Sequence, residues 1–188
     1  MKAYCIFYGH KYSYNKVVDL QKEFNKCGVS LKCDYIKDFS VIKEHWHKLK
    51  YFDNTNEDTI IIDIDQTVVG DISDMINYPV KENELVTYKN WSDGCPINGG
   101  WYKFKAGSLQ YVWDKFNSNI DKWQNYYYNN SIVHYQYYGE QNFVHDTVIE
   151  NGGNIVTMPE KWYSKDKIYE EYNPITEAQD EIEILELE

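Results

Sequence analysis

The chain has 188 residues, with 43% hydrophobic and 26% charged side chains, values that fit one globular domain with a substantial core. Its formal net charge of -11 argues against a protein that binds nucleic acid or inserts into an anionic membrane. The four cysteines include no Cys-x-x-Cys pair, which argues against a zinc site and favours free thiols.

The first elements predict a β-α-β unit. Residues 3–8 have the pattern of a strand, residues 17–28 that of a helix with a Lys-Cys-Gly stop, and residues 29–36 that of a second strand. Ligands of such units bind just beyond the strands, so we expect contacts at Tyr8, His10 and Asp34. The alternative for His10 is an ordinary surface turn.

Residues 59–74 form the stretch around which we expect the site to be built. The run of isoleucines at 60–62 is typical of a strand that is buried on both faces of a parallel sheet. Two carboxylates, Asp63 and Asp65, follow it, and side chains at i and i+2 of a strand point to the same side. Their repulsion predicts a divalent cation between them. The alternative is a solvated strand end.

The remaining chain predicts alternating helices and strands. We expect a helix over 41–51, a capped helical turn at 71–75, strands over 84–88 and 97–104, an amphipathic helix over 108–123, irregular or strand-like segments at 126–128 and 135–138, a helix from 140 and a last strand over 154–158. The paired Gly99 and Gly100 indicate either a close backbone approach to a ligand or a tight bend.

An acidic tail is expected at the end of the chain. Its last twelve residues contain six acidic residues and no basic one. We therefore predict one domain over residues 1–172 and a loosely held tail over 173–188, although the alternating apolar residues at 182–187 could instead pack as a terminal element.

Four blocks of the sequence resemble those of nucleotide-diphospho-sugar glycosyltransferases of the GT-A fold, most like family 8 and its small viral or phage members. They occur in the family's order: the strand, Asp-x-Asp and Gly-Asp-Ile-Ser turn at 60–74, Ile-Asn-Gly-Gly at 97–100, Gly-Glu-Gln-Asn-Phe at 139–143, and the strand with Pro-x-x-Trp at 155–162. The resemblance implies an α/β domain with a Rossmann-like, mostly parallel central sheet flanked by helices.

The resemblance also implies roles for particular residues. Asp63 and Asp65 would bind Mn2+ or Mg2+ on the donor diphosphate. Asp63 would also touch the donor nucleotide, together with Tyr8, His10 and Asp34. Asn98, Gly99 and Gly100 would line the sugar and acceptor side. Glu140 and Gln141 would be the catalytic residues near the anomeric carbon, where they would stabilise an oxocarbenium-like state.

Two departures from the family pattern stand out. The first acid of its Asp-Gln pair is Glu140 here, one methylene longer. No histidine follows His145, so the family's late third metal ligand and diphosphate contact have no counterpart. Lys161, Lys165 and Lys167 could supply positive charge for the diphosphate, or they could form a solvated cluster.

The resulting expectation is a metal-dependent, hexosyltransferase-like enzyme that moves sugar from a UDP- or GDP-sugar to a glycan or protein acceptor, with retention of configuration. No signal peptide or membrane span is recognisable, so we expect a cytoplasmic protein, in the host cytoplasm if it is viral.

Two other functions are compatible with parts of the sequence. Asp63, Asp65 and Thr67 resemble the nucleophile motif of haloacid-dehalogenase-type phosphatases, but the late acidic pair of that fold is missing after the strand at 155–158. The second alternative is a degenerate GT-A domain that binds a nucleotide-sugar or glycan without turnover, which the missing third metal ligand motivates.

Overall fold

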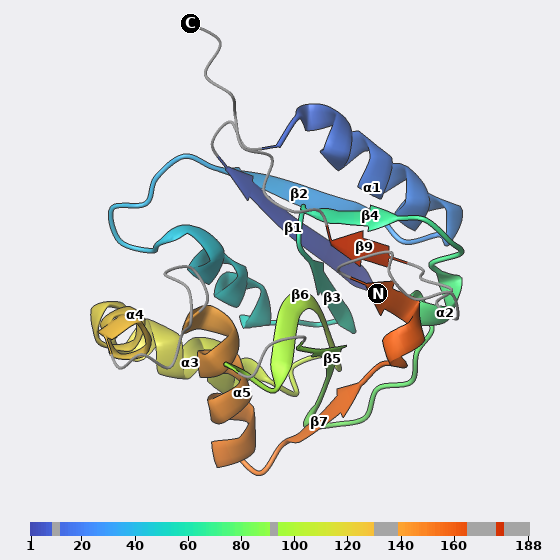
Figure 1. Cartoon of the computed structure of the whole chain (residues 1–188). Helices are drawn as coiled ribbons and strands as arrows, with labels where there is room; N and C mark the ends of the chain where they lie inside the picture. Colours follow the sequence, from blue (N-terminus) through green and yellow to red (C-terminus); the bar gives the residue numbers. More distant parts are fainter. Residues whose placement is uncertain (9–11, 91–93, 130–138, 165–175, 179–188) are drawn as a thin grey trace, which may run out of the picture.

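The computed structural model describes residues 1–8, 12–90, 94–129, 139–164 and 176–178 (Figure 1). The elements of the first half are β1 (Lys2–Tyr8), α1 (Tyr14–Lys26), β2 (Leu31–Ile36), the 3-10 helix η1 (Glu44–Phe52), β3 (Thr59–Ile62), β4 (Gln66–Val68) and α2 (Ser73–Ile76). Those of the second half are β5 (Glu84–Lys89), β6 (Ile97–Phe104), α3 (Gln110–Ser118), α4 (Ile120–Asn129), α5 (Gly139–Glu150), β7 (Asn154–Thr157), the 3-10 turn η2 (Glu160–Trp162), β8 (Tyr163–Ser164) and β9 (Thr176–Ala178).

The central sheet has six strands in the order β2-β1-β3-β6-β5-β7. Strands β1, β2 and β3 are parallel, β6 is antiparallel to both of its neighbours, and β7 is parallel to β5. All strands except β6 therefore run in the same direction. This arrangement confirms the predicted mostly parallel sheet, and the first β-α-β unit is confirmed by the pairing of β1 with β2 on either side of α1.

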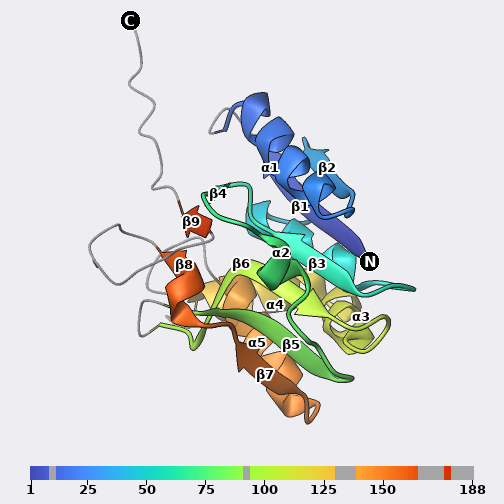
Figure 2. The ribbon, with the colours of Figure 1, turned by 90° about the vertical axis from the view of Figure 1, so that its right-hand side faces the viewer.

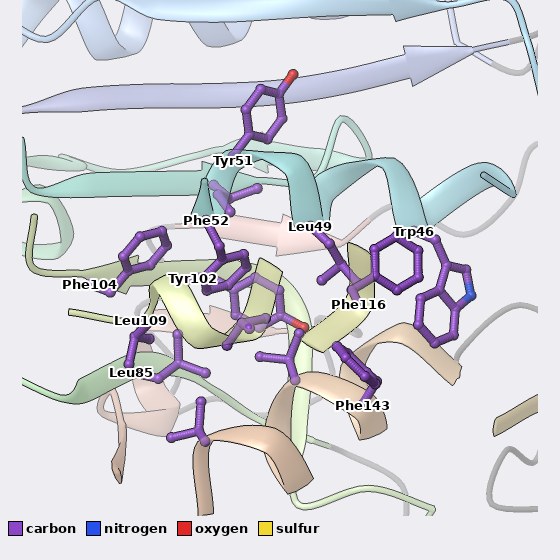
Figure 3. Close-up of a cluster of buried hydrophobic side chains, with 14 of the residues drawn as sticks. Trp46, Leu49, Tyr51, Phe52, Leu85, Tyr102, Phe104, Leu109, Phe116 and Phe143 are labelled. Atoms are coloured by element: carbon purple, nitrogen blue, oxygen red, sulfur yellow. The ribbon is translucent and has the colours of Figure 1, made fainter. Parts of the chain in front are cut away.

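Helices cover both faces of this sheet (Figures 1 and 2). One face packs against α1 and α2, and the other against η1, α3, α4 and α5. Ile60 and Ile62 point into the first core and Ile61 into the second, and all three are fully buried, as the isoleucine run predicts. Figure 3 shows the second core, in which aromatic rings from η1, α3, α5 and the sheet pack together.

A second, three-stranded sheet has the order β4-β9-β8. Strand β4 follows the acidic pair directly and is antiparallel to β9, with Gln66 opposite Ala178 and Val68 opposite Thr176. Thr176 is fully buried, and its hydroxyl lies 2.9 Å from that of Tyr88. Part of the segment that we expected to be a loosely held tail thus forms a strand beside the acidic pair (Figure 2).

Three helical predictions need correction. The helix expected over 41–51 is the 3-10 helix η1. The helix expected over 108–123 is two helices, because the side chain of Asn119 accepts a hydrogen bond from the Lys122 amide at 3.0 Å and so caps a new helix. That helix, α4, includes residues 126–128, which we expected to be irregular. The segment at 135–138 and the apolar residues at 182–187 lie outside the described residues.

Within the described ranges, none of the helices combines the length and the apolar character that crossing a membrane requires.

Candidate functional site

The two acids lie in a tight turn just after β3. Strand β3 ends at Ile62, and the Asp63 amide donates to the Gly100 carbonyl at 3.1 Å. The Gln66 amide then donates back to the Asp63 carbonyl at 3.2 Å, which closes the turn. The acids were expected on an extended strand end; the turn instead brings both of their side chains to one pocket.

That pocket opens at the carboxyl ends of β1 and β3, where open α/β sheets bind ligands. Its volume is about 350 Å³ including its mouth, and it is lined by Ile6, Tyr8, Tyr12, His45, Asp63, Ile64 and Asp65. Three of the lining residues, Tyr8, Tyr12 and His45, carry aromatic rings. The Tyr8 hydroxyl lies 3.2 Å from His45 Nε2. The pocket therefore combines flat apolar surfaces with two carboxylates.

Lys48 connects the acidic turn to α5. Its ammonium lies 2.9 Å from Asp63 Oδ1, 3.3 Å from Glu140 Oε2 and 3.0 Å from the Gly99 carbonyl, and the residue is 1% exposed. Burial alone would lower the pKa of Lys48, but the carboxylates of Asp63 and Glu140 raise it above its ordinary value. Lys48 is thus a buried cation that two carboxylates share.

The 3-10 geometry of η1 explains why Lys48 faces inward. With three residues per turn, His45, Lys48 and Tyr51 lie in one row along the helix. Each meets a polar partner, namely Tyr8 for His45, Asp63 for Lys48, and Asp34 for Tyr51 at 2.7 Å. Sequence reasoning missed Lys48, because an α-helical period places it away from the apolar face of Trp46 and Leu49.

The Ile-Asn-Gly-Gly block at 97–100 packs directly against this network. A Cβ at Gly99 would lie 2.9 Å from the Tyr102 hydroxyl and 3.1 Å from Lys48 Nζ. A Cβ at Gly100 would lie 2.9 Å from Asn98 Oδ1, which accepts the Gly100 amide at 2.8 Å. The close approach that the glycine pair predicted is therefore, among the described residues, an approach to polar side chains of the protein itself.

The first turn of α5 completes the group. Glu140 accepts a hydrogen bond from the Tyr102 hydroxyl at 2.9 Å, and Gln141 Oε1 accepts one from the Gly99 amide at 3.0 Å. The hydrogen bond from the Gly99 amide fixes Oε1 of Gln141 toward Gly99, so Nε2 can donate to another group. Among the described residues, no acceptor for Nε2 occurs. The predicted residues Asp63, Gly99, Glu140 and Gln141 are thus brought together.

Asp65 has a different environment from Asp63. Gln66 Nε2 donates to Asp65 Oδ1 at 3.1 Å, and no lysine contacts its carboxylate in the described part of the chain. Burial raises the pKa of Asp65 to about 6, and the negative charge of Asp63 adds to this shift. Asp65 is therefore a carboxylate whose charge the protein does not neutralise by itself.

The other predicted contacts are distributed unevenly. Tyr8 lines the pocket, whereas Asp34 does not: it accepts a hydrogen bond from Tyr51 and pairs with Lys50 at 3.3 Å and Lys32 at 3.1 Å. His10, Lys165 and Lys167 lie outside the described residues. Lys161 is exposed beyond the last strand of the central sheet.

The residues present fit a hard cation that takes part of its coordination from a ligand. Two carboxylates at one pocket, one of them without a positive partner, are the donors that Mg2+ and Mn2+ use together with substrate phosphates and water. The described residues contain no cluster of three or more His, Cys, Asp or Glu side chains that could bind a metal alone. A metal would therefore depend on ligands from its substrate.

Comparison with solved structures shows that this fold is shared with glycosyltransferases. A glycosyltransferase involved in the glycosylation of the major capsid of PBCV-1 is similar with a TM-score of 0.61 and 13% identity, over 95% of this chain and 92% of that one. The galactosyltransferase LgtC, solved in complex with donor and acceptor sugar analogs, has a TM-score of 0.57 and 10% identity, over 95% and 86%.

GlyE of Streptococcus pneumoniae TIGR4 is also similar, with a TM-score of 0.57 and 12% identity over 86% of this chain. The chain spans 46% of the length of GlyE. No protein-family model and no curated protein matches the sequence. At these identities the comparisons establish the fold, and they confirm the predicted GT-A class of α/β domain.

Proposed function

We propose that the protein is a metal-dependent glycosyltransferase that moves a sugar from a nucleoside-diphosphate donor to a glycan or protein acceptor. The observation that carries the proposal is the pocket in which Asp63 and Asp65 meet at the carboxyl ends of β1 and β3. The sharing of this fold with glycosyltransferases supports it. The proposed donor is a UDP- or GDP-sugar, and the proposed outcome is retention of configuration.

The two carboxylates would bind Mn2+ or Mg2+ together with the donor diphosphate. The metal would supply stabilisation of the negative charge that develops on the departing diphosphate, an effect worth several kcal/mol. Asp65 would contribute the charge that the protein leaves unneutralised. Lys48 would keep the Asp63 carboxylate in one orientation through its 2.9 Å contact.

Residues of α5 would act on the sugar. The Gln141 amide is fixed through the Gly99 N–H, so its Nε2 is prepared to donate to a sugar oxygen. Glu140 is 3% exposed and lies between Lys48 and Tyr102, which suits a group that orients its neighbours and adds negative charge near an oxocarbenium-like carbon. Asn98 would line the same side.

A donor screen tests the proposal. The full chain is incubated with UDP- and GDP-sugars and Mn2+, and release of nucleoside diphosphate is followed with and without candidate acceptors. We expect metal-dependent release or transfer that Asp65→Asn reduces by at least about a hundredfold, because the variant loses a charged metal ligand.

The matched control is Asp74→Asn, which changes an exposed acid in the following helical turn and is expected to retain full activity. Metal-dependent donor binding without any turnover would favour the binding module instead. Activity that is indifferent to EDTA and to Asp65→Asn would reject the proposal.

A further inference from the structure

Lys16 lies in the first turn of α1 and reaches across to β4. Its ammonium donates to Thr67 Oγ1 at 2.6 Å and to the Gln66 carbonyl at 3.3 Å. Both partners are neutral. The residue is half-buried, so its charge sits close to the acidic turn and still meets the surface.

The charge of Lys16 is not neutralised by direct contact. In the described ranges, Lys16 takes part in no ion pair, although Asp65 and Asp19 are close enough to act on it electrostatically. Burial lowers the pKa of Lys16, and these two acids oppose the shift. Lys48 is different, because two carboxylates already contact it.

Lys16 also lines a groove of the protein. The groove has a volume of about 650 Å³ including its mouth and runs between α1 and β4, where it is lined by Lys16, Asp19, Leu20, Lys22, Glu23, Gln66, Thr67 and Val68. The acidic pocket includes Asp65 and the groove includes Gln66, the next residue of the chain. Because Asp65 acts electrostatically on Lys16, an anion held at Asp65 through a metal would lie within the field of Lys16.

We propose that Lys16 binds the diphosphate of the nucleotide-sugar donor and carries part of its charge when the sugar departs. A lysine ammonium is a compact cation that suits phosphate oxygens. A diphosphate that shares a metal with Asp65 would exchange the neutral partners of Lys16 for charged ones, which form stronger hydrogen bonds. This inference rests on the proposed function, since it concerns the same donor.

Titration calorimetry on the full chain with Mn2+ tests the inference, with UDP and GDP as probes and UMP and GMP as references. In Lys16→Met, which keeps the apolar stem without the charge, we expect diphosphate affinity to fall by about tenfold or more, because one hydrogen bond between charged groups is lost. The monophosphate affinity is expected to fall less. Lys16→Arg should restore most of the diphosphate affinity.

The matched control is Lys22→Met, a lysine on the same helix and groove for which the structure shows no contact with β4, and its affinities should not change. If Lys16→Met lowers the melting temperature but leaves the diphosphate affinity within about twofold of wild type, Lys16 only tethers α1 to β4 and the inference is wrong. If the wild type binds no diphosphate with Mn2+, the proposed function fails and this inference with it.

Discussion

The two acids of the Asp63–Asp65 turn differ in their positive partners. Asp63 belongs to a buried network in which Lys48 is shared with Glu140. Asp65 has an amide donor and an ammonium nearby but no direct ion pair among the described residues. One end of the turn is therefore paired with a lysine of the protein, and the other end is left to a ligand.

The difference separates residues that hold the side chains of the site in position from a residue that binds a ligand there. A buried cation between two carboxylates fixes side-chain positions, because removing the cation leaves two acids without a positive partner. A partly buried acid with a raised pKa favours cation binding, because a metal offsets both its burial and the repulsion from Asp63. The predictions below test this division.

The largest effect is expected for Lys48→Met. The substitution leaves Asp63 and Glu140 without their shared cation, so we expect the free energy of unfolding to fall by about 3–5 kcal/mol. Urea denaturation measures it. Lys50→Met is the control on the same helix, since Lys50 is 33% exposed and its ion pair with Asp34 is expected to contribute about 1 kcal/mol or less. Equal losses in the two variants would contradict the division.

In metal-free protein, Asp65→Asn should raise the free energy of unfolding, whereas Lys48→Met lowers it. Because the pKa of Asp65 is raised from 3.8 to about 6, the folded state binds more protons than the unfolded state between these pH values. The contribution of Asp65 to the free energy of unfolding therefore falls as the pH rises through this window. At pH 7 we expect Asp65→Asn to be more stable than wild type by about 1–3 kcal/mol.

Thermal unfolding at pH 4 and pH 7 in EDTA checks this sign. The difference in melting temperature between variant and wild type should be smaller at pH 4 than at pH 7. Adding Mn2+ at pH 7 should raise the melting temperature of the wild type and not that of the variant. A wild type that is as stable as the variant at pH 7 would show that Asp65 is already neutralised.

The smallest effect is expected for Thr176→Val, which removes the hydroxyl that contacts Tyr88 beneath the turn. We expect a loss of about 1–2 kcal/mol, because the Tyr88 hydroxyl is left buried without this partner. The double variant with Tyr88→Phe should recover part of the loss, as measured by urea denaturation in a double-mutant cycle. Additive losses would show that the two hydroxyls do not interact.

Much of the fold was predictable because local pattern and global packing agree. The isoleucine run of β3 is apolar without interruption, and the structure buries Ile60 and Ile61 against opposite cores. The strands that pair with β3 and the glycine block within β6 follow equally local signals. Of the candidate site, the meeting of the acidic turn with Gly99 and Glu140 could be predicted only through the resemblance to a family.

The remainder depends on contacts that the sequence does not encode locally. Lys48 lies inside because η1 takes a three-residue period, which its tertiary partners favour over the α-helical one. Strand β9 forms in a segment whose composition indicates a solvated tail, because β4 offers it an edge to pair with. Lys16 looks like an ordinary helical lysine until β4 is placed beside it.

The pairing of β4 with β9 has a consequence for how the protein matures. The two strands are far apart in the chain, and contacts of large sequence separation form slowly. During synthesis the emerging chain can build β1, β2 and β3 early, but the ladder that steadies Gln66 must wait until residues 176–178 leave the ribosome. A nascent chain would therefore have a folded scaffold before its acidic turn acquires its final alignment.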